Sequence, residues 1–402
     1  MKKRAFQVLF VTLLLDMIGM GMLIPILPII FTDPTSPAFL LTGYSPTAQY
    51  AMAGLLTALF GLMQFVAAPI LGELSDVYGR KKFLTLGVGI LAFSQLLFGF
   101  GIETGSLLIL FVSRIIAGLA AGNFSIAQAS IADITPPELR ARNFGLIGVA
   151  VGIGFIIGPV LGGWVASSFG DAAAPFWFAT GLGILNLISI SLFLPETHVD
   201  RKAAQQFHIW KGIHNIQNAW RDKDARPVYI ASFLYIAGFN FFISFIGILL
   251  VARFGLSESA IGTFFGAVGF WIIITQGFIL RIISKKYRER QVLRYSLIML
   301  AIAMSLYPFV PTIIWIYVLI PLLAIPNGLT MANMTALISK SVGPTKQGAA
   351  LGINASLMAL AQGTIPLLAG FGSGFFGIAT PFLAGSTLAL GSWYILFIKK
   401  RT

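Results

Sequence analysis

The stretch that decides the fold is Gly72-Glu-Leu-Ser-Asp76-Val-Tyr-Gly79-Arg80-Lys81-Lys82, a short charged turn between two long apolar runs. The runs on either side, residues 48–71 and 83–101, are each long enough to cross a bilayer core at about 1.5 Å per helical residue. The turn must therefore lie on one face of a membrane. Its three consecutive basic residues indicate the cytoplasmic face.

The composition points to a polytopic helical membrane protein. Of the 402 residues, 57% are hydrophobic and only 10% are charged, and the mean hydropathy is +0.88, well above the range of soluble domains. Dividing the apolar runs at clusters of charge, proline and glycine predicts twelve membrane-spanning helices. These begin near residues 5, 48, 83, 107, 144, 174, 227, 259, 292, 313, 348 and 378.

The distribution of charge sets the expected topology. All 27 Lys and Arg residues except Arg114 and Arg253 fall in loops or termini on one side of the predicted spans, which predicts that both termini are cytoplasmic. The loops expected on the opposite side carry acidic residues instead: Asp33, Glu103, Asp171 and Glu258. The net charge of +13 thus reflects topology, and we expect no nucleic-acid partner.

Several chemistries are not expected from this sequence. The chain has no cysteine and therefore no disulfide or thiolate site. Its three histidines lie in one linker without the i,i+4 spacing of a metal-binding pair, and no phosphate-binding glycine loop is present. The first apolar run is too long for a cleaved secretory signal and is expected to remain as the first span. We expect no metal, no cofactor and no enzymatic activity.

The sequence is predicted to be an internal duplication. A shift of about 205 residues places Gly61 on Gly266 and Gly72 on Gly277, and after short slips Pro159 matches Pro366. This predicts an N-terminal six-helix bundle over 1–194, a cytoplasmic linker over 195–226 and a C-terminal six-helix bundle over 227–402, with parallel repeats. The linker is predicted to contain an amphipathic helix on the inner leaflet, with a partner or regulatory site as the alternative. Its apolar residues are Phe207, Trp210, Ile213, Ile216 and Trp220.

These motifs resemble those of a known transporter family. The stretch 72–82 resembles the signature turn between helices 2 and 3 of the major facilitator superfamily. Residues 110–122 are similar to the helix 4 motif of its drug:proton antiporters, and residues 154–163 to their helix 5 antiporter motif. Residues 15–28 and 131–140 resemble helix 1 and the helix 4–5 loop of tetracycline/proton antiporters.

The resemblance implies an all-α transporter that works by alternating access, with proton-coupled efflux of an amphiphilic organic compound or drug as the leading expectation. The alternative is a proton-independent or importing carrier of a metabolite or lipid, and a non-transporting receptor is disfavoured by the buried charges and paired glycine motifs. We expect a monomer in a bacterial inner membrane, surrounded by lipid and exchanging protons and a small molecule. Ser94 and Gln95 stand where tetracycline transporters carry an acid, which weakens tetracycline-magnesium as the substrate.

Two motifs are candidates for conformational change. Gly79 permits a tight reversal of the chain. The resemblance implies that the charged turn acts as a gate latch. The alternative is a loop whose basic residues only set the membrane topology. The glycine-rich fifth span is predicted to pack closely against neighbouring helices and to slide along them during transport. The alternative is ordinary packing of small residues without movement. The gating residues are Gly72, Asp76, Gly79, Arg80, Asp133 and Arg140, and the helix 5 residues are Gly154, Gly158, Pro159, Gly162 and Gly163.

Two ionisable residues lie deep within predicted spans, Asp16 and Arg114. A charge there costs at least ~2.5 kcal/mol, so each residue needs a function. The resemblance implies that both side chains face the central cavity. A carboxyl group there whose pKa depends on its surroundings can carry protons. The alternatives are a static ion pair or separate action, because the two positions differ in depth by a nominal ~10 Å.

The second half is predicted to supply amide and apolar groups to a substrate cavity, because its spans contain no acidic residue. Such a cavity suits an amphiphilic molecule better than a multiply charged ion. Each side chain could instead serve helix packing. Together with two glutamines from the first half, the predicted cavity residues are Gln64, Gln128, Phe239, Asn240, Trp271, Gln276, Asn327, Asn333, Asn354, Met358 and Gln362.

Overall fold

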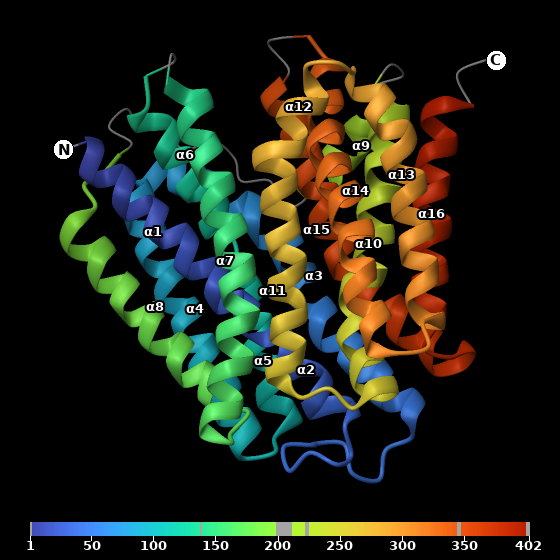
Figure 1. Ribbon diagram of the computed structural model, residues 1–402. Coiled ribbons are helices and arrows are strands. Elements are labelled where there is room, and N and C mark those ends of the chain that lie inside the picture. Colours follow the sequence, from blue (N-terminus) through green and yellow to red (C-terminus); the bar gives the residue numbers. More distant parts are fainter. Residues whose placement is uncertain (1, 137–138, 198–210, 222–224, 344–346, 399–402) are drawn as a thin grey trace. The chain divides into compact units, whose positions relative to one another are not determined.

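The computed structural model describes residues 2–136, 139–197, 211–221, 225–343 and 347–398, and all regular elements among them are helices (Figure 1). The linker residues Phe207 and Trp210 lie outside the described residues. In the first half the helices are α1 (Lys2–Gly21), α2 (Leu23–Thr32), α3 (Pro46–Tyr78), α4 (Arg80–Glu103), α5 (Leu107–Ala120), α6 (Asn123–Ile134), α7 (Arg140–Phe169) and α8 (Ala174–Phe193). They are followed by α9 (Lys211–Arg221), α10 (Arg226–Phe254), α11 (Glu258–Ile274), a π-helix η2 (Thr275–Ile279), α12 (Leu280–Ser284), α13 (Glu289–Leu306), a 3-10 turn η3 (Tyr307–Phe309), α14 (Ile313–Lys340), α15 (Gln347–Phe376) and α16 (Thr380–Phe397).

Within the described residues, eleven helical segments are long and apolar enough to cross a membrane. Four of them combine more than one element. α1 and α2 form one candidate span and α5 and α6 another, while α11 continues through η2 into α12 and α13 continues into η3. The last helix, α16, is not among the eleven. The chain is therefore a multi-pass helical protein, and the count of twelve spans stays a prediction.

Contacts between residues group the chain into two compact units. Unit 1 consists of residues 1–42, 62–211 and 256–266, and unit 2 of residues 43–61, 212–255 and 267–402. Three helices are therefore divided between the units. The first part of α3 belongs to unit 2, the first part of α11 belongs to unit 1, and α9 has only its first residue, Lys211, in unit 1. Each unit is described separately below.

The core of unit 1 is built around α1. Leu9 and Leu13 are fully buried and pack with Ile126 of α6 and Ile190 of α8 in one apolar cluster, which also includes residues of α4 and α7. Because lipid tails are as apolar as these side chains, burial alone does not drive helices together in a membrane. Close approach through small residues then decides which helices pair.

Glycine ends several helices in a left-handed or otherwise positive-φ conformation. Gly79 has φ +107° between α3 and α4, Gly170 has φ +63° after α7, and Gly255 has φ +61° after α10. A Cβ atom is strained in this region. The tight reversal expected at Gly79 therefore has the backbone conformation that requires glycine.

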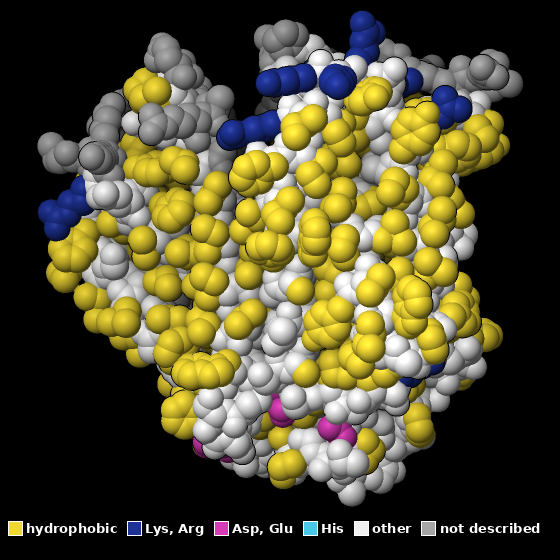
Figure 2. Space-filling model, viewed as in Figure 1, with side chains coloured by type: hydrophobic (Ala, Val, Ile, Leu, Met, Phe, Trp, Pro, Cys, Tyr) yellow, Lys and Arg dark blue, Asp and Glu magenta, His cyan; other side chains and the backbone are white. Residues whose placement is uncertain are grey.

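Basic side chains gather at one end of unit 2. Figure 2 shows dark-blue Lys and Arg side chains along the edge formed by α12 and the start of α13. This end includes Arg281, Lys285, Lys286, Arg288 and Arg290. The concentration is what the positive-inside distribution of the sequence predicts for the cytoplasmic ends of spans.

The described part of the linker forms α9. Trp220 is 63% exposed and stacks with the guanidinium of Arg226, whose Cζ lies 5.7 Å from the ring centre. Asn215 Nδ2 donates a hydrogen bond to Ser356 Oγ of α15 at 3.0 Å. The helix is thus attached to unit 2 and keeps an aromatic ring exposed, as an interfacial helix does.

Candidate functional site

The first candidate centre surrounds Asp16 on α1. Asp16 is half-buried, and the polar side chain that faces its carboxyl group is Asn123, the first residue of α6. Asn123 is 2% exposed, and neither of its amide atoms completes a hydrogen bond with any described residue. A buried amide without partners is unfavourable, so the bonding at this contact can respond to a proton or a ligand.

The local sequence explains why Asn123 reaches this position. The span that contains α5 and α6 is interrupted at Ala121 and Gly122, and α6 then begins with Asn123. Gly87 of α4 leaves room for the amide, because a Cβ atom there would collide with Asn123 Oδ1. Asn123 was not predicted as a site residue, although it directly follows the glycine that closes the helix 4 motif.

The second candidate centre surrounds Arg114 on α5. Arg114 is 5% exposed, and its Cζ lies 4.5 Å from the centre of the Phe98 ring, a cation–π distance. Its Nη2 donates a long hydrogen bond to Gln95 Oε1 at 3.4 Å. Gln95 Nε2 in turn donates to the backbone carbonyl of Gly19 on α1 at 2.9 Å.

Asp16 and Arg114 belong to separate arrangements. Both residues are described, and no ion pair within 4.0 Å joins them. Arg114 reaches α1 through the neutral side chain of Gln95, at a carbonyl three residues beyond Asp16. Gln95 thus connects the buried cation of α5 to the helix that carries the buried acid.

Two of the hydrogen bonds in unit 2 join a side chain of α10 to a predicted amide on a neighbouring helix. The Tyr235 hydroxyl donates to Asn327 Oδ1 of α14 at 2.8 Å. Ser232 Oγ donates to Asn354 Oδ1 of α15 at 2.8 Å. Tyr235 and Ser232 were not among the predicted residues, although both are polar, three positions apart and within an apolar span, which is a signal of helix–helix hydrogen bonding.

The other predicted cavity residues have differing environments. Asn240 and Asn333 each donate to a carbonyl of their own helix, Ile236 O at 2.9 Å and Leu329 O at 2.8 Å. Gln276 lies in η2 and is exposed, as is Met358 at 38%. Half-buried side chains complete the set: Gln64, whose Oε1 has no partner in the described chain, Gln128, Phe239, Trp271 and Gln362. The ring centres of Phe239 and Phe242 lie 6.2 Å apart, and the two rings are nearly parallel.

The charged turn forms a network centred on Arg80, the first residue of α4. Arg80 is 8% exposed. Its Nε lies 3.2 Å from Asp133 Oδ2 at the end of α6, its Nη1 donates to Ser75 Oγ at 2.8 Å, and it forms an ion pair with Asp76. The Arg80 backbone N–H donates to Glu196 Oε1 at 3.0 Å. The network therefore joins the ends of α3, α4, α6 and α8 within unit 1.

Other members of the predicted gating motif contribute less to this network. A Cβ atom at Gly72 would meet nothing within 4 Å, so close packing does not explain that glycine in this structure. The side chain of Arg140 lies outside the described residues. Ser75 and Glu196 were not predicted, because their approach to Arg80 depends on how α3 ends and where α8 ends.

Replacing Arg80 with alanine is expected to slow turnover about tenfold without weakening ligand binding. A charge-assisted hydrogen bond contributes roughly 1.5–3 kcal/mol, and losing that from one conformation changes a rate by about tenfold per 1.4 kcal/mol. Transport rate and ligand affinity, measured on the same purified protein, check this. Lys82→Ala is the control, because Lys82 is exposed and has no partner among the described residues. A weaker binding constant with unchanged turnover would count against a gate.

The helix 5 glycines face two different neighbours in unit 1. Gly154, Gly158 and Gly162 lie four residues apart on α7 and pack against the backbone of residues 14–22. A Cβ atom at Gly158 would lie 2.7 Å from Ile18 O, and one at Gly162 would lie 2.6 Å from Met22 O. α7 therefore touches α1 at the level where α1 gives way to α2.

The second side of α7 packs against the start of α11. A Cβ atom at Gly163 would lie 2.8 Å from the Glu258 carbonyl carbon, and one at Gly262 would lie 3.2 Å from the Pro159 carbonyl carbon. A related contact occurs inside unit 2, where Gly370 of α15 packs against the Tyr50 carbonyl of α3. Helices in such contacts meet backbone to backbone, without interlocking side chains.

Comparisons with known proteins agree with this arrangement of helices. The model of the Major Facilitator Superfamily matches residues 9–366 and 228–402. The chain is 30% identical over 372 residues to the class C tetracycline resistance protein of Escherichia coli, covering 90% of this chain and 88% of that protein. It is 28% identical over 400 residues to multidrug resistance protein 1 of Bacillus subtilis strain 168, covering 97% and 95%.

A solved structure with the same fold is the human organic anion transporter MFSD10 (TETRAN), which has a TM-score of 0.73 and 25% identity and covers 98% of this chain and 99% of that one. The relatives are transporters, not enzymes. The family match spans most of the sequence. The chain belongs to the major facilitator superfamily and is a multi-pass membrane transporter.

Proposed function

We propose that this transporter exports an amphiphilic organic compound in exchange for protons. The observation that carries the proposal is Asp16, an acid within an apolar span whose polar neighbour is the neutral amide of Asn123. A carboxyl group held by a neutral partner can exist in both protonation states, whereas one locked to a cation remains charged. The tetracycline and multidrug resistance relatives support efflux as the direction.

In this proposal α1 is the element that responds to the proton. A proton on Asp16 removes its charge and changes the hydrogen bonding that it can offer to Asn123. The same helix is bound to α4 and α5 through the Gly19 carbonyl, Gln95 and Arg114. A change at Asp16 can therefore alter how α1 is held against three neighbouring helices.

The glycine surfaces of α7 supply the complementary requirement for movement. Because Gly154, Gly158 and Gly162 present no side chain, α1 can shift along α7 without interlocked side chains having to separate.

We further propose twelve spans in two six-helix halves, 1–194 and 227–402, with both termini in the cytoplasm. We also propose a monomer in a bacterial inner membrane.

The proposed substrate region combines apolar rings and amides. Phe239 and Trp271 offer apolar surface, while Asn327 and Asn354 already accept hydrogen bonds from Tyr235 and Ser232. Amides held in this way can orient a polar group without carrying charge. An organic compound with one polar or charged group fits these side chains better than a multiply charged ion.

Transport by purified protein in liposomes tests the proposal. An imposed pH gradient, with the acidic side opposite the substrate, is expected to drive uptake of a fluorescent amphiphilic cation such as ethidium. Collapsing the gradient with a protonophore is expected to stop this uptake. Uptake that proceeds equally with and without the gradient would contradict proton coupling, and absence of transport for a broad set of amphiphiles would contradict the substrate class.

A second candidate is a proton-independent or importing carrier of a metabolite or lipid, in which Asp16 and Arg114 contact the substrate directly. The observation in its favour is that Nε of Arg114 is buried and has no hydrogen-bond partner among the described residues. The relative MFSD10 is described as an organic anion transporter. Transport of an organic anion that is insensitive to the pH gradient and is lost in Arg114→Gln would favour this candidate.

A further inference from the structure

One cavity in unit 2 is separate from the candidate sites described above. It lies between the first turns of α10 and α13 and the last turns of α14 and α16, and its volume is about 250 Å³. This is the end of unit 2 where basic side chains gather (Figure 2). The lining residues are Pro227, Val228, Arg290, Leu337, Lys340, Ser341, Ile395 and Leu396.

The cavity has a cationic side. Arg290 is half-buried, and its guanidinium group has neither a hydrogen bond nor an ion pair with any described residue. Lys340 also lines the cavity and forms an ion pair with Glu289, while 65% of its side chain remains exposed. Two cations and one carboxylate leave a net positive charge at the cavity. A half-buried guanidinium without a partner is a favourable site for a bidentate anion such as phosphate.

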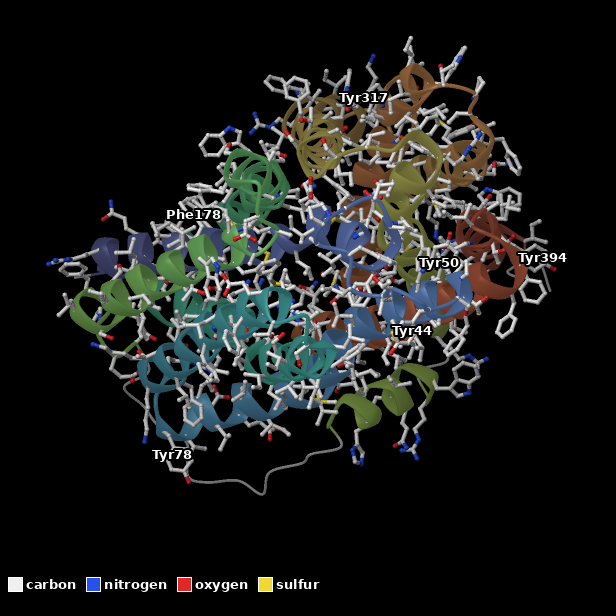
Figure 3. The ribbon with its side chains drawn as sticks, turned by 90° about the horizontal axis from the view of Figure 1, so that it is seen from below. Tyr44, Tyr50, Tyr78, Phe178, Tyr317 and Tyr394 are labelled. Atoms are coloured by element: carbon white, nitrogen blue, oxygen red, sulfur yellow. The ribbon has the colours of Figure 1, made fainter. Side chains whose placement is uncertain are left out.

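The rest of the lining is apolar. Val228 and Leu396 are 4% and 3% exposed, and Pro227, Leu337 and Ile395 are half-buried. Tyr394, next to Ile395, is 51% exposed and projects away from α16 (Figure 3). Tyrosine near the end of a membrane-spanning helix is typical of the membrane–water interface. Cationic and apolar groups side by side at an interface match a ligand that is itself anionic at one end and apolar at the other.

The size of the cavity separates it from a drug-binding site. Pockets for drug-sized ligands are on the order of 300–1,000 Å³, which is larger than this cavity. The space suits a single headgroup, with any acyl chains lying outside along the apolar helix surfaces. Basic pockets between transmembrane helices at the cytoplasmic side are known to accept phosphate-bearing lipid headgroups.

We propose that this cavity binds the phosphate-bearing headgroup of an anionic phospholipid. Arg290 contacts the phosphate, Lys340 adds positive charge beside it, and the ends of α10, α14 and α16 contact the glycerol and the first part of the acyl chains. The lipid then bridges four helices of unit 2 at their ends. This binding site goes beyond the proposed transport function and does not depend on which compound is transported.

Native mass spectrometry of protein released from nanodiscs tests the site. The nanodiscs contain phosphatidylcholine with added phosphatidylglycerol, and the double variant R290Q/K340Q is compared with K285Q/K286Q. Lys285 and Lys286 are exposed, belong to unit 2 and do not line the cavity, so the control loses the same charge. Retention of phosphatidylglycerol is expected to fall about tenfold or more in R290Q/K340Q, because the charge-assisted hydrogen bonds to the phosphate are lost. Retention is expected to remain unchanged in the control.

A soluble probe identifies the chemical source of the anion. Dioctanoyl phosphatidylglycerol is expected to raise the melting temperature of the wild-type protein in detergent, whereas inorganic phosphate at equal concentration is not. R290K, which keeps the charge, is expected to retain much of the shift and guards against a folding defect in the double variant. Equal retention of lipid in the two double variants would overturn the proposal. An equal shift with inorganic phosphate would assign the cavity to a free anion instead of a lipid.

Discussion

Asp16→Asn is expected to abolish transport driven by a pH gradient, reducing it to the level of empty liposomes. Asparagine has nearly the same shape as aspartate, but it cannot bind or release a proton in this pH range. The contact with Asn123 is retained as amide against amide, so the folded structure is expected to persist. Proteoliposomes with an imposed pH gradient measure the effect directly.

The matched control for this substitution is Asp33→Asn. Asp33 follows α2 and accepts hydrogen bonds from the Thr35 backbone N–H at 3.0 Å and from the Thr35 hydroxyl. It carries the same charge as Asp16 but lies outside the helices, and its loss is expected to leave gradient-driven transport unchanged. If Asp16→Asn retained the wild-type pH dependence, the proton-carrying role of Asp16 would have to be abandoned.

Substrate exchange distinguishes a proton carrier from a substrate ligand at this position. With equal pH on both sides, labelled substrate exchanges with unlabelled substrate without net proton movement. If Asp16 carries the proton, Asp16→Asn is expected to keep this exchange while losing gradient-driven accumulation. If Asp16 instead binds the substrate, as in the alternative function, both activities are lost together.

Gly158→Ala is expected to destabilise the protein by ~1–3 kcal/mol, the usual range for overpacking. The added Cβ atom would lie 2.7 Å from Ile18 O and 2.8 Å from Gly21 Cα, both of which are backbone atoms that no rotamer change can move. α1 and α7 must therefore separate. The melting temperature in detergent and the transport rate are both expected to fall.

Gly152→Ala provides an unusually close control, because it is the same substitution on the same helix. A Cβ atom at Gly152 would meet nothing within 4 Å, and alanine favours helix over glycine by about 1 kcal/mol. Its melting temperature is expected to be unchanged or slightly higher. Equal losses in the two variants would mean that general helix properties, and not the contact with α1, determine the role of these glycines.

The turn at residues 72–82 shows how far local sequence reaches. The i,i+4 spacing of Asp76 and Arg80 makes their ion pair predictable, and the positive φ of Gly79 follows from the need for a tight reversal. The contact between Arg80 and Asp133 bridges 53 positions and depends on where α6 ends. Glu196 reaches the Arg80 backbone only because α8 ends beside the start of α4.

The two buried ionisable residues, Asp16 and Arg114, also show which features local sequence predicts and which depend on the tertiary structure. The sequence alone allowed Asp16 and Arg114 to form an ion pair or to act apart, since their nominal difference in depth of ~10 Å could be closed only by a long Arg side chain. The structure places Gln95 next to Arg114 and Asn123 next to Asp16, so each charge has a neutral neighbour. Gln95 was noted in the sequence only as a departure from the tetracycline transporters, and neither amide could be assigned to its charged neighbour beforehand.

The sequence by itself predicted long apolar helices and carried the motifs of the major facilitator superfamily, because these depend on composition and on residues near one another along the chain. Only the tertiary structure decided that Gly158 touches a neighbouring helix while Gly152 faces open space. The helical period specifies which residues share a face of α7. It does not specify which helix that face meets, because that choice depends on how all the helices pack together.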